Sequence, residues 1–131
     1  MEKAQERTSI DSSKAIYEYL HPRMQDLDVE ESWIMLLNQH YKLIKAMAIS
    51  HGGITETAVD VRVILKEALL CNATVLVLAH NHPSNHIQPS KSDDQLTQRV
   101  KKACEAVRIY FLDHVIVTDG TYYSYHDSGR L

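Results

Sequence analysis

Two histidines and an aspartate in the middle of the chain have the types and the spacing of a metal-ligand set. His80 and His82 follow the apolar run 73–79, which is typical of a buried strand, and extended backbone directs side chains at i and i+2 to the same side. Asp93 follows at the start of an expected helix, where the helix dipole favours a negative charge. Two imidazoles and one carboxylate can hold Zn²⁺ and leave a coordination position for water, which is the pattern of a catalytic zinc site. The alternative is a polar strand end followed by an ordinary helix cap.

The elements that would position these residues alternate between strands and helices. Strands are expected at 30–38 and 43–50, as a hairpin with a polar turn, and the pair Gly52–Gly53 would end the second strand. A helix is expected from about 57 to 71, because apolar residues recur there at helical spacing. The buried strand 73–79 follows directly. Strand, helix and strand in this order predict a sheet packed by a crossover helix.

The second half of the chain continues the same pattern. Residues 83–91, rich in Pro, Ser, Asn and His, form a loop, and a helix is predicted to begin with Ser92 as N-cap and Gln95 closing a capping box. Asp93 would then lie in the first turn of that helix. The last expected elements are strands at 109–118 and 121–125, joined by a tight turn at Asp119–Gly120.

The amino-terminal part of the chain carries no evident chemistry. Residues 1–28 are predicted as a helical extension or linker, and 29–131 as one domain. Ile16, Tyr17 and Leu20 indicate one amphipathic helix that ends near His21–Pro22.

The composition is that of an ordinary globular protein without a strongly charged binding surface. The chain has 131 residues, of which 44% are hydrophobic and 24% are charged, and its formal net charge is −3. With an isoelectric point near 6.2, no general basic field favours nucleic acid, so DNA binding by this domain is not expected. Arg99, Lys101 and Lys102 are expected on the solvated face of a helix.

The compartment is inferred from what the sequence lacks. No apolar run approaches the roughly 20 residues that cross a bilayer, and the charged amino terminus has no apolar core of a secretion signal. Cys71 and Cys104 fall at apolar positions of helical patterns, which favours buried thiols over a disulfide. We therefore expect a soluble, cytoplasmic protein with no membrane partner.

The arrangement His80-x-His82-x7-Ser90-x2-Asp93 resembles the signature of the JAMM/MPN (JAB domain) metallopeptidase family. The flanking residues are similar to the RadC branch of that family: His-Asn-His-Pro-Ser at 80–84, Pro89, Thr97 and the tripeptide Leu112-Asp113-His114. The resemblance covers roughly residues 29–126. It implies one α/β domain of MPN type, with a mixed, curved sheet flanked by two main helices, here with an amino-terminal helical extension.

The resemblance also implies a reaction. One Zn²⁺ per chain, held by His80, His82 and Asp93, would acidify a bound water and polarise the carbonyl of an amide bond. A glutamate on the first strand would take the proton from that water and return it to the leaving amine. Alignment on the strand end selects Glu30, with Glu31 as the fallback. The alternative is that both glutamates only solvate the start of the strand.

Further site residues follow from the same resemblance. Ser90 would donate a hydrogen bond to the tetrahedral oxyanion, although Ser90 also fits a local helix cap. Asp113 and His114 would either orient a metal ligand or form a satisfied polar pair in the core. His86 and His51 are expected to be loop histidines.

Two positions depart from the family pattern. Asn85 stands where glycine usually follows His-Pro-Ser, and asparagine tolerates left-handed backbone better than other non-glycine residues. Asp60-Val61-Arg62 stands where His-Pro-Arg is more usual, and the sequence assigns no role to Arg62.

The function that the resemblance implies is a zinc-dependent hydrolase, similar to a metallopeptidase or isopeptidase, of a family associated with DNA repair. Its partner would be a peptide or isopeptide-linked substrate. The alternative is a non-catalytic MPN scaffold or binding module in DNA repair or mobile-element biology. A nuclease is disfavoured by the acidic balance of charge. Full-length RadC proteins carry an additional helix-hairpin-helix region that this sequence lacks, so the repair role transfers weakly.

Overall fold

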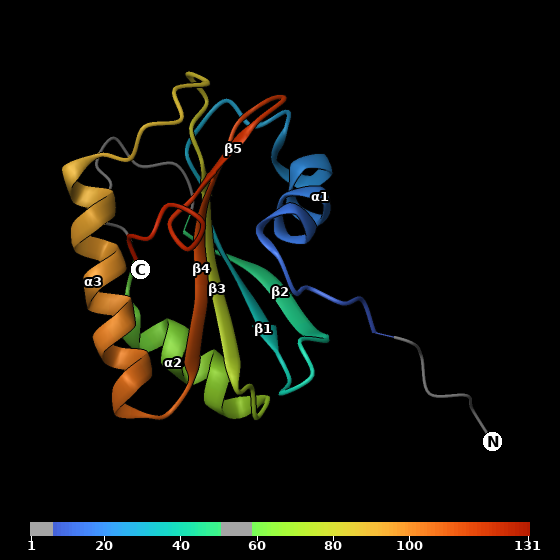
Figure 1. The fold of residues 1–131 in the computed structure, drawn as a ribbon, viewed down its shortest axis with the longest axis vertical. Helices are drawn as coiled ribbons and strands as arrows, with labels where there is room; N and C mark the ends of the chain where they lie inside the picture. The colour runs from blue at the N-terminus through green and yellow to red at the C-terminus, as the bar shows by residue number, and fades with distance from the viewer. Residues whose placement is uncertain (1–6, 51–58) are drawn as a thin grey trace.

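A five-stranded mixed sheet runs through the middle of the molecule and carries helices on both faces (Figure 1). The computed structural model describes residues 7–50 and 59–131. The strands are β1 (Ser32–Leu37), β2 (Leu43–Ser50), β3 (Val75–Asn81), β4 (Tyr110–Val117) and β5 (Tyr122–Ser124), and the helices are α1 (Ser13–Met24), α2 (Val61–Leu70) and α3 (Lys91–Ala106). The predicted mixed α/β fold is therefore confirmed.

The order of the strands places β3 at the centre of the sheet. The sheet runs β2-β1-β3-β4-β5; β3 is parallel to β4, and the other neighbours are antiparallel. The parallel pair is joined through α3, as a crossover connection requires. Ser32 of β1 and Ile116 of β4 lie opposite His80. The candidate metal ligands thus lie at the end of the most enclosed strand.

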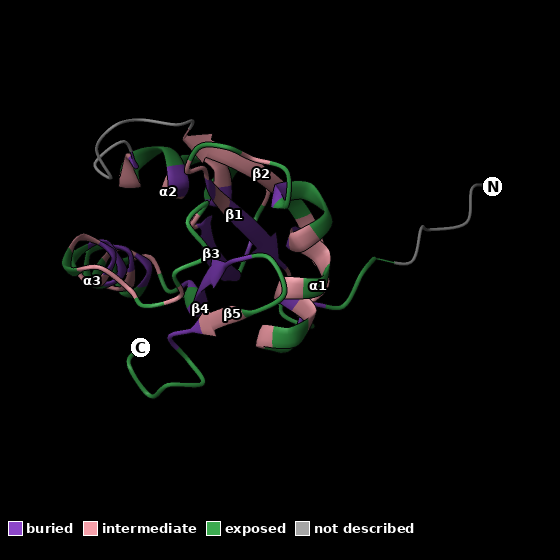
Figure 2. Ribbon diagram, turned by 90° about the horizontal axis from the view of Figure 1, so that it is seen from above, coloured by how far each residue is buried: buried purple, intermediate pink, exposed green. Residues whose placement is uncertain are grey.

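Each face of the sheet has its own core. Leu76 and Leu78 of β3 pack with Ile64 of α2 and Val100 of α3 on one face. Residues of opposite parity, such as Val77, pack against α1 on the other face. Figure 2 shows the buried residues gathered in the central strands and on the helix sides that face them. Both faces of β3 are covered, which explains why its sequence shows no polar alternation.

Helix α1 belongs to this packing. Ile16 and Leu20 are fully buried in the core beneath it. The predicted end at His21–Pro22 is wrong, because the helix continues through Pro22 to Met24. Burial of Met24 against the same core favours the extra turn over the intrinsic cost of proline. The division of the chain at residue 28 stays a prediction.

Other helix boundaries in the structure differ from the predicted ones by a few residues. The predicted cap at Ser92 is wrong: Ser90 is the N-cap of α3, and its capping-box partner is Asp93 rather than Gln95. Helix α2 begins later than predicted, after the N-cap Asp60, and the glycine pair at 52–53 lies outside the described residues. Both cysteines are free, but only Cys104 is buried; Cys71 caps the end of α2 and is half-exposed.

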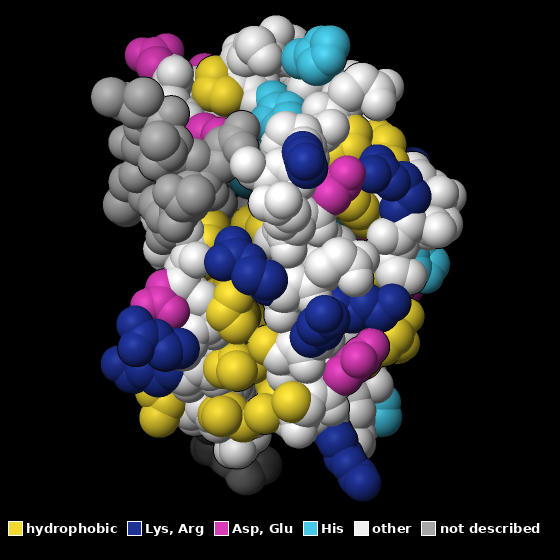
Figure 3. All heavy atoms as spheres, turned by 90° about the vertical axis from the view of Figure 1, so that its left-hand side faces the viewer, with side chains coloured by type: hydrophobic (Ala, Val, Ile, Leu, Met, Phe, Trp, Pro, Cys, Tyr) yellow, Lys and Arg dark blue, Asp and Glu magenta, His cyan; other side chains and the backbone are white. Residues whose placement is uncertain are grey.

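The outer surface of α2 and α3 carries both charged and apolar side chains. Basic and acidic side chains are interspersed over the face shown in Figure 3, with apolar side chains between them. Arg99 and Lys102 are exposed on α3, as expected for a solvated helix face. Within residues 7–50 and 59–131, no helix has both the length and the apolar character needed to cross a bilayer.

Candidate metal centre

Four side chains from three separate segments meet at the carboxyl end of β3. Glu30 precedes β1, His80 lies near the end of β3, His82 directly follows the strand, and Asp93 lies in the first turn of α3. In the described part of the chain these residues offer one ligand atom each, and the four atoms lie within 4.8 Å of one another. The structure therefore brings together the three predicted metal ligands and the predicted general base.

The two imidazoles turn the same nitrogen toward the cluster. Nε2 of His80 lies 2.9 Å from Nε2 of His82 and 3.1 Å from Oδ1 of Asp93. His82 Nε2 lies 3.4 Å from Oδ2 of the same carboxylate. The other nitrogen of each ring is engaged elsewhere: Nδ1 of His82 contacts the carbonyl oxygen of His86 at 2.5 Å, and Nδ1 of His80 contacts His114 Nε2 at 2.8 Å.

This donor set fits a divalent cation. A neutral His82 that donates its Nδ1 proton to a carbonyl has a lone pair on Nε2, and that lone pair faces the Nε2 atom of His80 and a carboxylate. Electron-rich atoms so close together require a cation or a shared proton between them. Tetrahedral Zn²⁺, with Zn–N distances of about 2.0–2.1 Å, would space neighbouring ligand atoms roughly 3.3 Å apart. The observed separations of 2.9 to 3.4 Å bracket that value.

Asp93 is fixed in place by the start of α3. Its backbone N–H donates to the Ser90 hydroxyl oxygen at 3.0 Å, and its Oδ2 accepts from the Ser90 backbone N–H at 2.8 Å. This reciprocal capping box explains why a carboxylate can be buried here and still point in one direction. Ser90 is thus a local helix cap, as the alternative interpretation predicted. A contact between the Ser90 hydroxyl and an oxyanion stays a prediction.

Burial and the neighbouring polar groups shift the pKa values of Asp93 and His82 in opposite directions. Burial of the Asp93 carboxyl would raise its pKa, but the interactions with His80 and His82 outweigh burial and hold the pKa well below the usual range. Burial likewise disfavours a charged His82, yet the hydrogen bonds to Asp93 and to the His86 carbonyl, with the charge of Glu30, leave its pKa raised above 6.5. The carboxylates around His82 thus favour its protonated form.

Zinc binding is therefore expected to displace a proton from His82 and not from Asp93. Because the pKa of His82 is raised, the apparent zinc affinity should fall as the pH drops from about 7.5 to 5.5, by up to roughly tenfold per pH unit for each proton displaced. Asp93 stays ionised throughout this range. Calorimetric titration in two buffers of different ionisation enthalpy measures the released protons, and zinc binding without proton release near pH 6.5 would contradict the assignment.

Side chains alternate between the two faces of the sheet along the segment that enters β1, so Glu30 and Glu31 point in opposite directions. Continuing the antiparallel register of Ser32 with His80 places Glu30 opposite His82, and Glu30 Oε1 lies 3.6 Å from His80 Nε2 and 4.0 Å from His82 Nε2. Glu31 lies on the other face, where its Oε1 accepts a hydrogen bond from the indole of Trp33 at 2.8 Å. Glu30, not the fallback Glu31, reaches the cluster; its role as a base stays a prediction.

A residue that no sequence pattern singled out, Asn81, holds Glu30 there. Asn81, between the two histidines, points to the opposite face and is 4% exposed. Its Oδ1 accepts from the backbone N–H of Glu31 at 2.7 Å, and its Nδ2 donates to the carbonyl oxygen of Val29 at 3.0 Å. One amide thus binds the backbone on both sides of Glu30. The signal was present as the polar residue in a His-Asn-His run at the end of an apolar strand.

Replacing Asn81 by Ala is expected to lower kcat while zinc stays bound. The residues on either side of Glu30 lose their anchor, and a displacement of a catalytic group by about 1 Å can cost on the order of 100-fold in rate. The loss of the two hydrogen bonds should also lower the free energy of unfolding by about 1–3 kcal/mol. Steady-state kinetics beside zinc content tests this, and a folded variant with wild-type kcat would contradict it.

Asp113 and His114, which were predicted as a pair, lie in two different environments. His114 is fully buried beside His80, whereas Asp113 accepts hydrogen bonds from Ser124 Oγ at 2.6 Å and from the His126 backbone N–H at 3.0 Å. Burial raises the pKa of Asp113 and holds the pKa of His114 well below 6.5, with the charge of His80 adding to the latter. Asp113 therefore anchors β5 and the segment after it.

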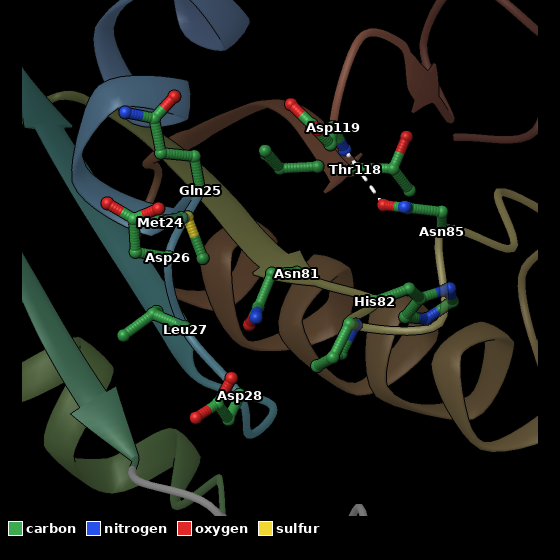
Figure 4. A pocket seen from close by; sticks show the side chains of 12 residues that line it. Met24, Gln25, Asp26, Leu27, Asp28, Asn81, His82, Asn85, Thr118 and Asp119 are labelled. Carbon is green, nitrogen blue, oxygen red and sulfur yellow. Dashed lines mark hydrogen bonds between the residues drawn. The ribbon is translucent and has the colours of Figure 1, made fainter.

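The loop after His82 borders a polar cavity of about 330 Å³ (Figure 4). Asn85 has the expected left-handed backbone, with φ of 61°, and its Oδ1 accepts from the backbone N–H of Asp119 at 3.0 Å. The side chain thus ties the loop to the β4–β5 turn, which glycine in its place would not. Carboxylates of Asp26, Asp28 and Asp119 line the same cavity beside His82.

Of the remaining predicted positions, those that the structure describes contribute no side chain to the cluster of ligand atoms. The backbone carbonyl of His86 orients His82, while His51 lies outside the described residues. Arg62 pairs with the N-cap Asp60 through two contacts, Nε to Oδ1 at 3.2 Å and Nη2 to Oδ2 at 3.0 Å. That pair stabilises the start of α2.

The fold and the site together define a mixed α/β domain with a two-histidine, one-aspartate cluster at the end of its central strand and a glutamate beside it. The family model described as the RadC-like JAB domain matches residues 10–130, and the chain belongs to this family. That match includes α1 as well as the sheet.

Curated proteins with similar sequences support the same family assignment. The chain is 44% identical over 126 residues to a UPF0758 protein of Porphyromonas gingivalis, covering 95% of this chain and 56% of that protein. It is 42% identical over 120 residues to a UPF0758 protein of Flavobacterium johnsoniae, covering 92% and 52%. For a UPF0758 protein of Symbiobacterium thermophilum the identity is 35% over 125 residues, covering 95% and 53%. The chain therefore spans about half the length of these relatives.

Proposed function

We propose that this chain is a zinc-dependent hydrolase that cleaves an amide bond in a peptide or isopeptide-linked substrate. One observation carries the proposal: two imidazole nitrogens and a carboxylate converge within 3.4 Å of one another, and a second carboxylate lies beside them. Membership in the RadC-like JAB family supports the same chemistry. Thiolates, which structural zinc sites commonly use, do not contribute to the cluster.

Each side chain then has a separate task. Bound Zn²⁺ would supply a Lewis acid that lowers the pKa of water and polarises the scissile carbonyl. His80, His82 and Asp93 hold the metal. Glu30 accepts the proton of the attacking water and delivers it to the leaving amine. The Ser90 hydroxyl donates to the developing oxyanion, which is compatible with its cap because the cap uses the hydroxyl oxygen as acceptor and not its proton.

The test combines metal content with hydrolysis. Purified protein supplied with Zn²⁺ at neutral pH should hold about one zinc per chain. It should hydrolyse members of a library of peptides and isopeptides, lose that activity to a chelator and regain it with zinc. Protein that binds no zinc would overturn the proposal. Zinc binding without hydrolysis of any library member would favour the scaffold, and DNA binding that falls steeply with salt would favour a nuclease.

A further inference from the structure

A line of hydrogen bonds leads from His80 away from the metal cluster and returns to Asp93. His80 Nδ1 lies 2.8 Å from His114 Nε2, and His114 Nδ1 lies 2.6 Å from Thr97 Oγ1. The Thr97 hydroxyl donates to the backbone carbonyl of Asp93, one turn earlier in α3, at 2.8 Å. The line thus connects two metal ligands through two residues that do not reach the cluster themselves.

Counting donors gives this line a direction. The Thr97 hydroxyl has one proton, which goes to the Asp93 carbonyl, so its oxygen accepts from His114 and the proton of His114 sits on Nδ1. A neutral His114 then has a lone pair on Nε2, which accepts from Nδ1 of His80. A neutral His80 with its proton on Nδ1 has a lone pair on Nε2, the atom that faces His82 and Asp93.

The surroundings keep the line rigid. His114 and Thr97 are both 0% exposed, so water does not compete for their hydrogen bonds. The ring of His114 stacks on Tyr125, with centroids 4.8 Å apart and planes inclined by 6°. Tyr125 in turn donates its hydroxyl to Asp94 at 2.7 Å. The imidazole of His114 is therefore held at one face as well as at both nitrogens, and rotation of the ring would break several contacts at once.

We propose that Thr97 and His114 are positioning residues that fix His80 with its proton on Nδ1, which leaves Nε2 available to a metal. This inference rests on the proposed zinc site. Metal-binding histidines usually donate their second nitrogen to a carboxylate, a carbonyl or water. Here the acceptor is a second imidazole, whose own orientation depends on a threonine hydroxyl. We call this line of hydrogen bonds from Thr97 through His114 to His80 the relay. Because Thr97 and His114 are neutral, the relay sets the tautomer of His80 without placing a charge next to it.

Thr97→Val and Thr97→Ser form the matched pair that tests the relay. Valine has the shape of threonine but cannot accept from His114, so His114 should move its proton to Nε2 and force the proton of His80 onto Nε2, where it blocks the metal. Serine keeps the hydroxyl. We expect zinc affinity, measured by competition with a chelating dye, to fall about 10–100-fold in Thr97→Val and to change little in Thr97→Ser. Equal affinities in the two folded variants would overturn the proposal.

A second readout uses wild-type protein without metal. In protein labelled with ¹⁵N at its histidines, nitrogen shifts report the tautomer of each ring, and a coupling across the hydrogen bond to His114 identifies His80. The proposal expects the proton on Nδ1 of His80 in wild type and Thr97→Ser. A proton on Nε2 of neutral His80 in wild type would overturn it, even if Thr97→Val fails to fold. Failure of wild type to bind zinc would instead refute the proposed function, and the metal-free tautomer separates the two.

Discussion

Glu30→Gln is expected to lower turnover about 10²–10⁴-fold while the protein still binds zinc, because a carboxamide cannot accept the proton of the attacking water. The substitution keeps the shape of the side chain, and Glu30 lies farther from both imidazoles than Asp93 does. Turnover of the best substrate found in the library, measured beside zinc content, tests the prediction. Loss of zinc together with activity would mean that Glu30 acts as a ligand instead.

Glu31→Gln is the matched control. The two glutamates are neighbours in sequence, and the same change of charge is made on the face of the sheet that carries Trp33. An amide oxygen can still accept from the indole, so turnover and zinc content should both stay near wild type. If both variants lost turnover equally, the net charge near the site would explain the effect better than a general base at Glu30.

Asp93→Asn is expected to remove zinc from the protein at concentrations that saturate wild type. The loss of an anionic ligand should weaken affinity by on the order of 100-fold or more, since changes to residues behind the ligands already cost 10–100-fold. Asparagine can still accept from the Ser90 backbone N–H, so the start of α3 should remain capped. Zinc content after dialysis measures the loss.

Asp94→Asn provides the comparison one residue further along α3. Its carboxylate accepts from Tyr125 and pairs with Arg130, and it does not belong to the ligand cluster. Zinc at about 100 times its dissociation constant stabilises a folded protein by about 2.7 kcal/mol, roughly 10 °C in Tm for a domain of this size. Asp94→Asn should keep that increment and Asp93→Asn should lose it. An equal increment in both would exclude Asp93 as a ligand.

The sequence was sufficient to predict which side chains converge at the end of β3. His80 and His82 follow a long apolar strand, and the period of two in extended backbone puts them on one side without further information. Asp93 follows a loop and opens a helix. Ser90 and Ser92 offered two equivalent cap positions two residues apart, and only the position of the Asp93 side chain decides between them. Local patterns therefore predicted the elements well and their ends less well.

The sequence was not sufficient where two faces of a strand are equally apolar. Strand β1 is buried on both faces, so its pattern gives no parity that would place Glu30 rather than Glu31 beside the histidines. The register of β1 against β3 decides this, and that register depends on the whole sheet. The relay of Thr97 and His114 joins α3 to β4 across the core, and the crossing of two elements is not written in either segment alone.

The alternating sides of His80-Asn81-His82 have a consequence for how this chain can change in length. Both imidazoles face α3 and the intervening amide faces the opposite side, where it holds the backbone around Glu30. One residue inserted within β3 upstream of this tripeptide would exchange the two sides, turning the amide toward Asp93 and the imidazoles toward α1. One residue inserted between His86 and Pro89, beyond the carbonyl that orients His82 and the side chain of Asn85 that binds the β4–β5 turn, would only lengthen a loop. Insertions should therefore be harmful up to His86 and tolerated in the few residues that follow it.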